Sequence, residues 1–436
     1  RLLLQVPGVS LYGAGGVSSL PALHGLADDR VRVKVDGMDL VASCPNHMNP
    51  PLSYLDPSAV GSVKVYAGLV PVSLAGDSIG GSIIAESPPP EFAAPGEKYL
   101  LKGEVGGYYQ SNGDGYNANL SASAATDSLS LRYQGAVAKS RDYKAGGDFK
   151  TSTATGRLNH ALPLDVVGST AYDSRNQNLD IAWKQGNHLI EAQIGYQDIP
   201  EELFPNQRMD MLGNEEKSFN LNYTGDFTWG SLKAQVFYED VDHFMDFGPD
   251  KRFWYGTASG PGGTGMKSVD GIPCWPIGPT CAAGMPMNTE SNTLGASLQA
   301  DIDLSASHLL RVGAEYQGYN LDDWWSPSGA NMWPGTFWNI NDGQRDRLAL
   351  FGEWEARPTS QWLTQIGLRF EQVNMDTGDV RGYNITPSAP GNQYLEANAF
   401  NAQDHQQTDN NLNFTALARY EFDATKQLEF GYAHLV

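Results

Sequence analysis

The sequence predicts a mostly β fold whose larger part is a transmembrane antiparallel β-barrel. Three observations lead to this prediction. Apolar and polar side chains alternate over strand-length segments, short turns alternate with long polar loops, and aromatic residues lie at strand ends. A barrel with an apolar face toward lipid and a polar face toward its lumen shows all three features. A large secreted β-sandwich or propeller also alternates, but the aromatic girdle favours the barrel.

The composition bounds the class of protein and its partners. The chain has 436 residues and a net charge of −21. It is therefore long enough for more than one domain, and its acidity excludes nucleic acid as a partner while favouring the attraction of cations. No run reaches the roughly 18 uncharged apolar residues of a membrane helix. Strands of about 10 alternating residues are thus the expected spanning elements.

Two domains are expected, separated near the proline-rich stretch at 87–90. Residues 1–92 form a compact glycine-rich block, in which Asp36-Gly37 predicts a tight hairpin turn. Residues 97–436 contain the alternating segments. The chain begins without Met, has no signal peptide and stops in mid-strand, and an open-edged barrel is not viable in a membrane. We therefore expect a fragment of a larger protein that lacks both termini.

The strands of the second domain are predicted from period-two alternation. In the segment 362–370, the apolar face carries Trp362, Ile366, Leu368 and Phe370, and the polar face carries Gln365, Gly367 and Arg369. The segment 232–238 repeats this pattern. Counting such segments gives about fourteen candidate strands.

The connections between these strands are unequal in an orderly way. Short turns are expected at 185–187, 229–230, 305–307, 358–359 and 424–425, and long polar loops at 199–215, 248–290, 323–345 and 377–410. Aromatic side chains mark the strand ends, at Trp229, Trp354, Trp362, Tyr420 and Phe422. Short turns at one end and long loops at the other are typical of an outer-membrane barrel.

The cysteines indicate an oxidising compartment and one unusual thiol. Cys274 and Cys281 flank a Gly/Pro-rich loop and predict a small disulfide, with two unpaired surface thiols as the alternative. Pairing them leaves Cys44 as the odd cysteine, close to His47 and Met48. Thiol, imidazole and thioether ligands together suit Cu(I), or less selectively zinc. A buried inert thiol, or one paired with a cysteine outside this sequence, is the alternative for Cys44.

The first ninety residues resemble the plug domain of TonB-dependent outer-membrane receptors. The matching stretches are Leu3–Val9, Asp29–Gly37, Tyr54–Pro57, Val63–Gly68 and Gly80–Ile83. This resemblance implies an α+β plug inside a 22-stranded barrel that is only partly present here. It also implies a location in the outer membrane of a Gram-negative bacterium, contact with outer-membrane lipid, and the TonB-ExbB-ExbD complex as energy-transducing partner.

Within that family, the sequence is most similar to copper receptors of the OprC/NosA type. Those receptors carry Cys-x-x-x-Met in the plug and His-x-Met in the barrel. Cys44 and Met48 match the first motif, and His243-Phe244-Met245 matches the second. The similarity implies that copper ions, as the transported ligand, bind at Cys44, Met48, His243 and Met245. Possible accessory residues are His47, Met285 and Met287.

The residues themselves point to the same site. His243 and Met245 are separated by one residue, so both side chains lie on one face of their strand. This strand runs from the short turn at Trp229-Gly230 into the long loop at 248–290, which places the pair near the outward rim. A loop of the first domain that reaches this rim would bring Cys44 and Met48 against them.

Other interpretations stay open. Methionines fill packing gaps more often than they bind metal, and His243 in a loop mouth is equally compatible with solvation. An importer of a metal chelate (siderophore) or of cobalamin, or a secreted β-rich copper-binding or carbohydrate-binding protein, would share much of the pattern. An electron-transfer copper site is disfavoured because Met48 follows His47 directly. No nucleophile elbow, HExxH motif or phosphate loop is present, so no enzyme is expected.

Overall fold

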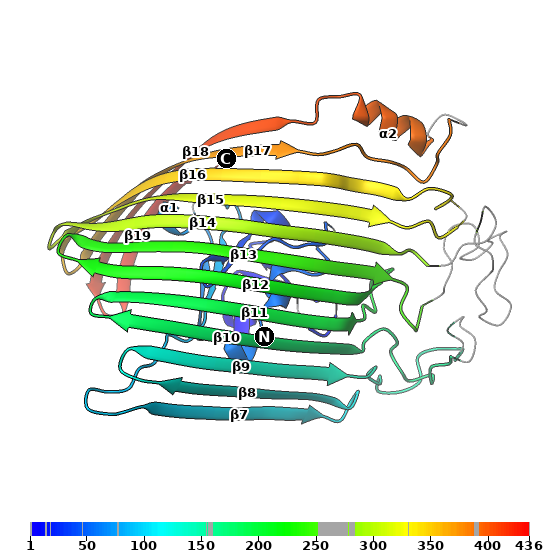
Figure 1. Ribbon diagram of the computed structural model, residues 1–436, viewed down its shortest axis with the longest axis horizontal. Helices are drawn as coiled ribbons and strands as arrows, with labels where there is room; N and C mark the ends of the chain where they lie inside the picture. The colour runs from blue at the N-terminus through cyan, green and yellow to red at the C-terminus, as the bar shows by residue number, and fades with distance from the viewer. Residues whose placement is uncertain are drawn as a thin grey trace.

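The larger part of the chain forms one curved antiparallel sheet that wraps around the N-terminal elements (Figure 1). The computed structural model describes residues 2–435 except 14, 18, 46, 76–77, 154, 156–159, 252–277, 279–283, 330 and 388–391. Within this part of the chain the sheet has thirteen strands, β7 to β19, and each pairs with its neighbour in sequence. The predicted mostly β fold, a transmembrane antiparallel barrel with an N-terminal α+β plug, is confirmed. The estimate of about fourteen strands was one too high for the described residues.

The strands of the barrel lengthen toward its middle, where the plug contacts its inner face. Their bounds are β7 Leu100–Gln110, β8 Gly115–Ala125, β9 Leu129–Ser140, β10 Tyr172–Gln185, β11 His188–Glu202, β12 Asp210–Phe227, β13 Gly230–Asp246, β14 Met287–Ser305, β15 His308–Trp325, β16 Phe337–Thr359, β17 Trp362–Asp376, β18 Gln407–Asp423 and β19 Lys426–His434. A further helix, α2 (Gln393–Asn401), lies between β17 and β18 and is capped by the Asn392 side chain.

The alternation predicted for β17 is confirmed. Ile366, Leu368 and Phe370 are exposed on the outer face, whereas Arg369 and Glu371 are buried on the inner face. Because successive side chains of a strand point to opposite faces, this pattern gives a lipid-compatible outside and a polar inside.

Four of the five short turns lie where the sequence predicted them, and the fifth lies at 360–361 instead of 358–359 because β16 continues to Thr359. Two long loops are shorter than expected. Strand β11 continues to Glu202 and β12 begins at Asp210, so the expected loop at 199–215 shrinks to 203–209. Likewise β15 ends at Trp325 and β16 begins at Phe337. The regular alternation of apolar and polar residues does not extend into these strand ends: β11 ends in Glu201-Glu202, and β16 begins with Phe337-Trp338.

The plug contains two small sheets and short helical turns. Its elements are η1 Leu2–Gln5, β1 Val9–Gly13, β2 Ser19–Leu23, η2 Asp28–Arg30, β3 Arg32–Val35, β4 Met38–Asp39, η3 Pro51–Tyr54, η4 Pro57–Ala59, β5 Ser62–Tyr66, α1 Val72–Ala75 and β6 Ser82–Glu86. Strands in the order β4-β3-β6-β5 form a mixed sheet, in which β3 and β6 run parallel. No α-helix among the described residues is long and apolar enough to cross a bilayer.

The predicted Asp36-Gly37 turn is present between β3 and β4. Both residues have positive φ, 49° and 81°, as a two-residue type I′ hairpin turn requires. The side chain of Gln235 on β13 donates a hydrogen bond to the Asp36 carbonyl at 2.8 Å. The turn therefore also docks the plug sheet on the barrel wall.

Candidate functional site

The plug loop between β4 and η3 carries Cys44 and Met48 to the barrel wall. Cys44 is fully buried, and its carbonyl accepts a hydrogen bond from the His47 backbone N–H at 2.9 Å. At the end of the loop, the Asn49 side chain donates to Asn214 Oδ1 on β12 at 2.8 Å. The loop is thus fixed to the wall beside the two predicted ligands.

Three adjacent barrel strands each place one methionine at the same level of the inner face. Met211 on β12 pairs with Met245 on β13, which pairs with Met287 on β14. All three side chains are fully buried. We call Met211, Met245 and Met287 the methionine row. On the next strand, β15, Trp325 continues this level.

The plug loop and the methionine row meet in one cluster. Cys44 belongs to the same buried cluster as the methionine row, and Met48 and Met285 pack against it from partly buried positions. The structure therefore brings together the predicted residues Cys44, Met48 and Met245 with both accessory methionines.

His243 lies on the inner face two residues before Met245 and is buried. Its Nδ1 is 3.2 Å from Asn214 Oδ1, and its Nε2 has no hydrogen-bond partner among the described residues. Because the Asn214 oxygen can only accept, Nδ1 carries the proton and Nε2 keeps its lone pair. This is the arrangement that a metal-binding imidazole requires.

One other predicted residue, His47, does not face the cluster. Its Nε2 lies 3.5 Å from Asp29 Oδ2. The hydrogen bond to Asp29 raises the pKa of the His47 imidazole above its ordinary value. Cys274 and Cys281, with their expected disulfide, lie outside the described residues.

Sequence reasoning missed Met209 and Met211. Both are buried in the cluster that contains Cys44 and Met245. A signal was present, because Met209-Asp210-Met211 has the same one-residue spacing as His243-Phe244-Met245 and as Met285-Pro286-Met287. All three pairs stand where a barrel strand meets a loop at the same end of the sheet.

The chemistry of the cluster is that of soft ligands. A thiol, several thioethers and one imidazole nitrogen form a set that selects Cu(I) over hard cations. Among the described residues, no group of three or more His, Cys, Asp or Glu side chains is arranged to hold a metal ion. Any metal held by the described cluster would therefore depend on its methionines. Flexible methionines also pack well in irregular cores, so the same residues serve both purposes.

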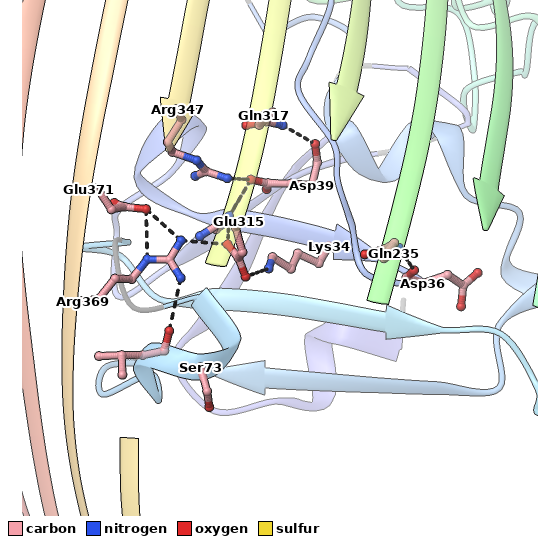
Figure 2. Close-up of polar contacts among 12 residues, drawn as sticks. Lys34, Asp36, Asp39, Ser73, Gln235, Glu315, Gln317, Arg347, Arg369 and Glu371 are labelled. Carbon is pink, nitrogen blue, oxygen red and sulfur yellow. Dashed lines mark hydrogen bonds and ion pairs between the residues drawn. The ribbon is translucent and has the colours of Figure 1, made fainter. Parts of the chain in front are cut away.

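A buried network of ion pairs fastens the plug sheet to the barrel (Figure 2). Arg32 on β3 donates through Nε to Asp39 Oδ2 at 2.9 Å, and Arg347 on β16 pairs with the same carboxylate. Burial raises the pKa of Asp39, but the neighbouring Arg32, Arg347 and Lys34 charges outweigh it and bring the pKa to about 2. Asp39 is therefore held as a carboxylate.

The network continues to the next strands. Glu315 on β15 lies 3.3 Å from Lys34 Nζ of the plug and 2.7 Å from Arg369 Nη2 on β17. Arg369 also pairs with Glu371 at 2.8 Å and donates to the carbonyl of Val72 at 3.3 Å. We call Arg32, Lys34, Asp39, Glu315, Arg347 and Arg369 the plug–barrel ion-pair network.

The ion-pair network lies between two cavities. The first cavity has a volume of about 430 Å³ and is lined by Pro45 and His47 of the plug loop. The second has a volume of about 450 Å³ and reaches Lys233 and Gln299, near the short turns. Both cavities are lined by Arg32, Asp39, Gln317 and Arg347. These residues therefore separate the cavity next to the plug loop from the cavity nearer the short turns.

Comparison with known families places the chain. Residues 153–434 match the TonB dependent receptor-like β-barrel, and residues 1–82 match the TonB-dependent receptor plug domain. The chain therefore belongs to the TonB-dependent receptor family, whose members are outer-membrane receptors. A comparison with curated proteins gives no match.

Several solved structures have the same fold. The copper transporter OprC is similar with a TM-score of 0.75 and 19% identity, over 100% of this chain and 61% of that one. The FrpB iron transporter from Neisseria meningitidis (F3-3 variant) has a TM-score of 0.65 and 17% identity, with coverages of 97% and 59%. The ferric yersiniabactin uptake receptor FyuA from Yersinia pestis has 0.62 and 13%, with coverages of 96% and 58%. The chain spans about three fifths of these proteins, whose cargoes differ.

Proposed function

We propose that the protein is a TonB-dependent importer of copper ions in the outer membrane of a Gram-negative bacterium. Copper would bind to Cys44 and Met48 of the plug and to His243 and Met245 of the barrel. The observation that carries this proposal is the single buried cluster in which the plug thiol meets the methionine row.

The composition of the site supports copper over other cargoes. Met211 and Met287 flank Met245 directly in the sheet, so thioethers surround the ion on the barrel side. The imidazole of His243 offers a nitrogen with no hydrogen-bond partner among the described residues. A buried set of sulfur ligands favours Cu(I) and disfavours Mg²⁺, Ca²⁺ and Mn²⁺.

The division of the ligands between two domains suggests how the ion is released. Force from the TonB-ExbB-ExbD complex on the plug would withdraw Cys44 and Met48 from the barrel ligands. A site with half of its ligands removed loses most of its affinity, and the ion would pass inward. The cavity beside Pro45 and His47 provides adjoining space for this step.

Metal analysis of a Cys44→Ser, Met48→Ala protein tests the site. We expect the purified wild-type protein to bind one copper ion and the double variant to bind none. Met38→Ala is the matched control, because Met38 is buried in a different plug cluster and its loss should leave copper binding intact. Full copper occupancy in the double variant would contradict the assignment.

A second candidate is an importer of a metal chelate such as a siderophore, or of cobalamin. The similarity to the FrpB and FyuA structures favours it as strongly as fold alone permits. Growth of a copper-uptake-deficient strain separates the two proposals. Rescue by the wild-type gene at limiting copper supports the copper importer, and rescue only when a chelate is supplied supports the alternative.

A further inference from the structure

Two buried carboxylates lie on the inner barrel wall, nearer the short turns than the methionine row. Glu216 on β12 and Glu239 on β13 are only 6% and 2% exposed. Glu216 pairs with Val241, and Ser218 pairs with Glu239. The two glutamates are therefore diagonal neighbours on the same face, at a separation that long side chains span.

Neither carboxylate has a compensating positive charge in the described part of the chain. The charged groups that act on Glu239 are Glu216 and Asp39, and both are acidic. Glu216 accepts a hydrogen bond from the Ser218 hydroxyl. A buried carboxylate without a counter-charge is strongly unfavourable, so the pair must hold either a cation or a proton.

A third oxygen points to a cation. Gln197 on β11 pairs directly with Glu216 and is buried. Its Nε2 donates to the Ser53 carbonyl at 2.8 Å and to Asn176 Oδ1 at 2.6 Å. These bonds fix the orientation of the amide, whose Oε1 has no hydrogen-bond partner among the described residues. The same is true of Glu239 Oε1.

A small cavity lies beside Glu216. A cavity of about 60 Å³ is lined by Glu216 and Ser218 from the barrel and by Tyr54 from the plug. A cavity of this size accommodates an ion together with a water molecule. Carboxylate and amide oxygens are the ligands that a hard divalent cation prefers.

We propose that Gln197, Glu216 and Glu239 form an oxygen-ligand site for a divalent metal ion. It is distinct from the sulfur site, and it does not depend on copper being the cargo. The ion neutralises the two carboxylates. It also stabilises the plug on the wall, because Gln197 donates to the Ser53 carbonyl in η3, directly after the plug loop.

Manganese binding to the full purified chain tests this proposal, because Mn²⁺ favours oxygen ligands and is visible by electron paramagnetic resonance. We expect one bound Mn²⁺ per chain, displaced by Ca²⁺ or Mg²⁺. Glu239→Gln and, separately, Glu216→Gln should each weaken binding at least tenfold. Glu215→Gln is the matched control, since Glu215 is the sequence neighbour whose side chain is exposed and pairs with Lys217.

The outcomes separate this site from the copper site. Cys44→Ser should keep the Mn²⁺ signal. Glu239→Gln should still bind Ag(I), a soft ion that takes the place of Cu(I) in the sulfur site. The proposal is overturned if the wild-type chain binds no Mn²⁺, or if both glutamate variants bind it as the wild type does. Either result would mean that the two carboxylates share a proton. If Glu239→Gln does not fold, two measurements still test the proposal. Glu216→Gln should bind Mn²⁺ more weakly, and Mn²⁺ should raise the melting temperature of the wild-type chain.

Discussion

At the scale of single residues, the methionine row combines packing with ligand chemistry. Leucine has nearly the volume of methionine but no sulfur, so Met245→Leu separates the two roles. We expect this variant to lose less than about 1.5 kcal/mol of stability, as volume-conserving core exchanges do. Its affinity for Ag(I), a soft stand-in for Cu(I), should fall at least tenfold by competition titration.

Met38→Leu provides the control for this exchange. Met38 is buried in the plug cluster around Val35 and Leu40, away from Cys44. Its replacement should change neither the melting temperature nor the Ag(I) affinity appreciably. Equal Ag(I) affinities for Met245→Leu and the wild type would show that the row is packing alone.

The sequence allowed some of these residues to be predicted, for physical reasons. Cys44, Met48, His243 and Met245 stand in two short motifs that match those of copper receptors, so the resemblance predicts them as ligands. The place of Met211 depends on strand register, which is shifted by an irregularity between Met211 and Gly213. Such a shift has no signature in the hydrophobic pattern, because the irregularity itself breaks the period of two on which that pattern depends.

At the scale of elements, the ion-pair network should control how firmly the plug is held. Arg347→Gln leaves the buried Asp39 carboxylate with less positive charge. Removing one partner of a buried pair costs about 3–5 kcal/mol. We therefore expect the plug of this variant to become protease-sensitive at a clearly lower urea concentration than in the wild type.

Lys64→Gln is the comparison for this variant. Lys64 pairs with Glu86 in the same plug sheet, but both side chains are about half exposed. Exposed pairs contribute about 1 kcal/mol or less. An equal shift in the two variants would contradict a special role for the buried network.

The same network predicts a dependence on pH. The pKa of Asp39 is lowered from 3.8 to about 2, so its contribution to plug docking is complete above pH 4 and is lost as the pH falls through 2. Labelling of buried Cys44 by a thiol reagent after acid pulses measures this opening, in a chain with Cys274→Ser and Cys281→Ser. Asp39→Asn should remove the transition, and an unchanged transition would assign it to other carboxylates.

The elements themselves were predictable only where the environment imposes a pattern. In the membrane zone, one face meets lipid and the other meets polar groups, so alternation reveals strands such as β17. Beyond that zone the outer face no longer meets lipid and the alternation is lost, so the ends of β11, β12, β15 and β16 were predicted to be loops. The ion-pair network was not foreseen, because Arg32 and its partner Glu315 are far apart in the sequence.

At the scale of the whole molecule, the net charge of −21 should draw cations toward the protein. Screening shortens the reach of this field from about 30 Å at 0.01 M salt to about 8 Å at 0.15 M. We expect the association rate of Ag(I) to fall over this range while the dissociation rate changes little. Stopped-flow measurements in nitrate salts would show this, and a salt-independent association rate would exclude steering.

The overall architecture was predictable because few structures satisfy the backbone in a membrane. A closed barrel pairs every strand, so alternation together with unequal connections points to one fold class. The way in which the plug packs against the barrel wall was harder to predict from the sequence. Cys44 and Met245 lie in one cluster because contacts between residues far apart in the sequence hold the plug against the wall, among them those of Asp36 with Gln235 and of Asn49 with Asn214.

The methionine row also limits how this barrel can change during evolution. Side chains alternate between the two faces, so one residue inserted between Trp229 and His243 would turn Met245 toward lipid. It would also move His243 to the outside. On the short-turn side of β12, β13 and β14, we therefore expect only insertions or deletions of an even number of residues within one strand to be tolerated. Single-residue changes in length should be confined to the loops beyond the row.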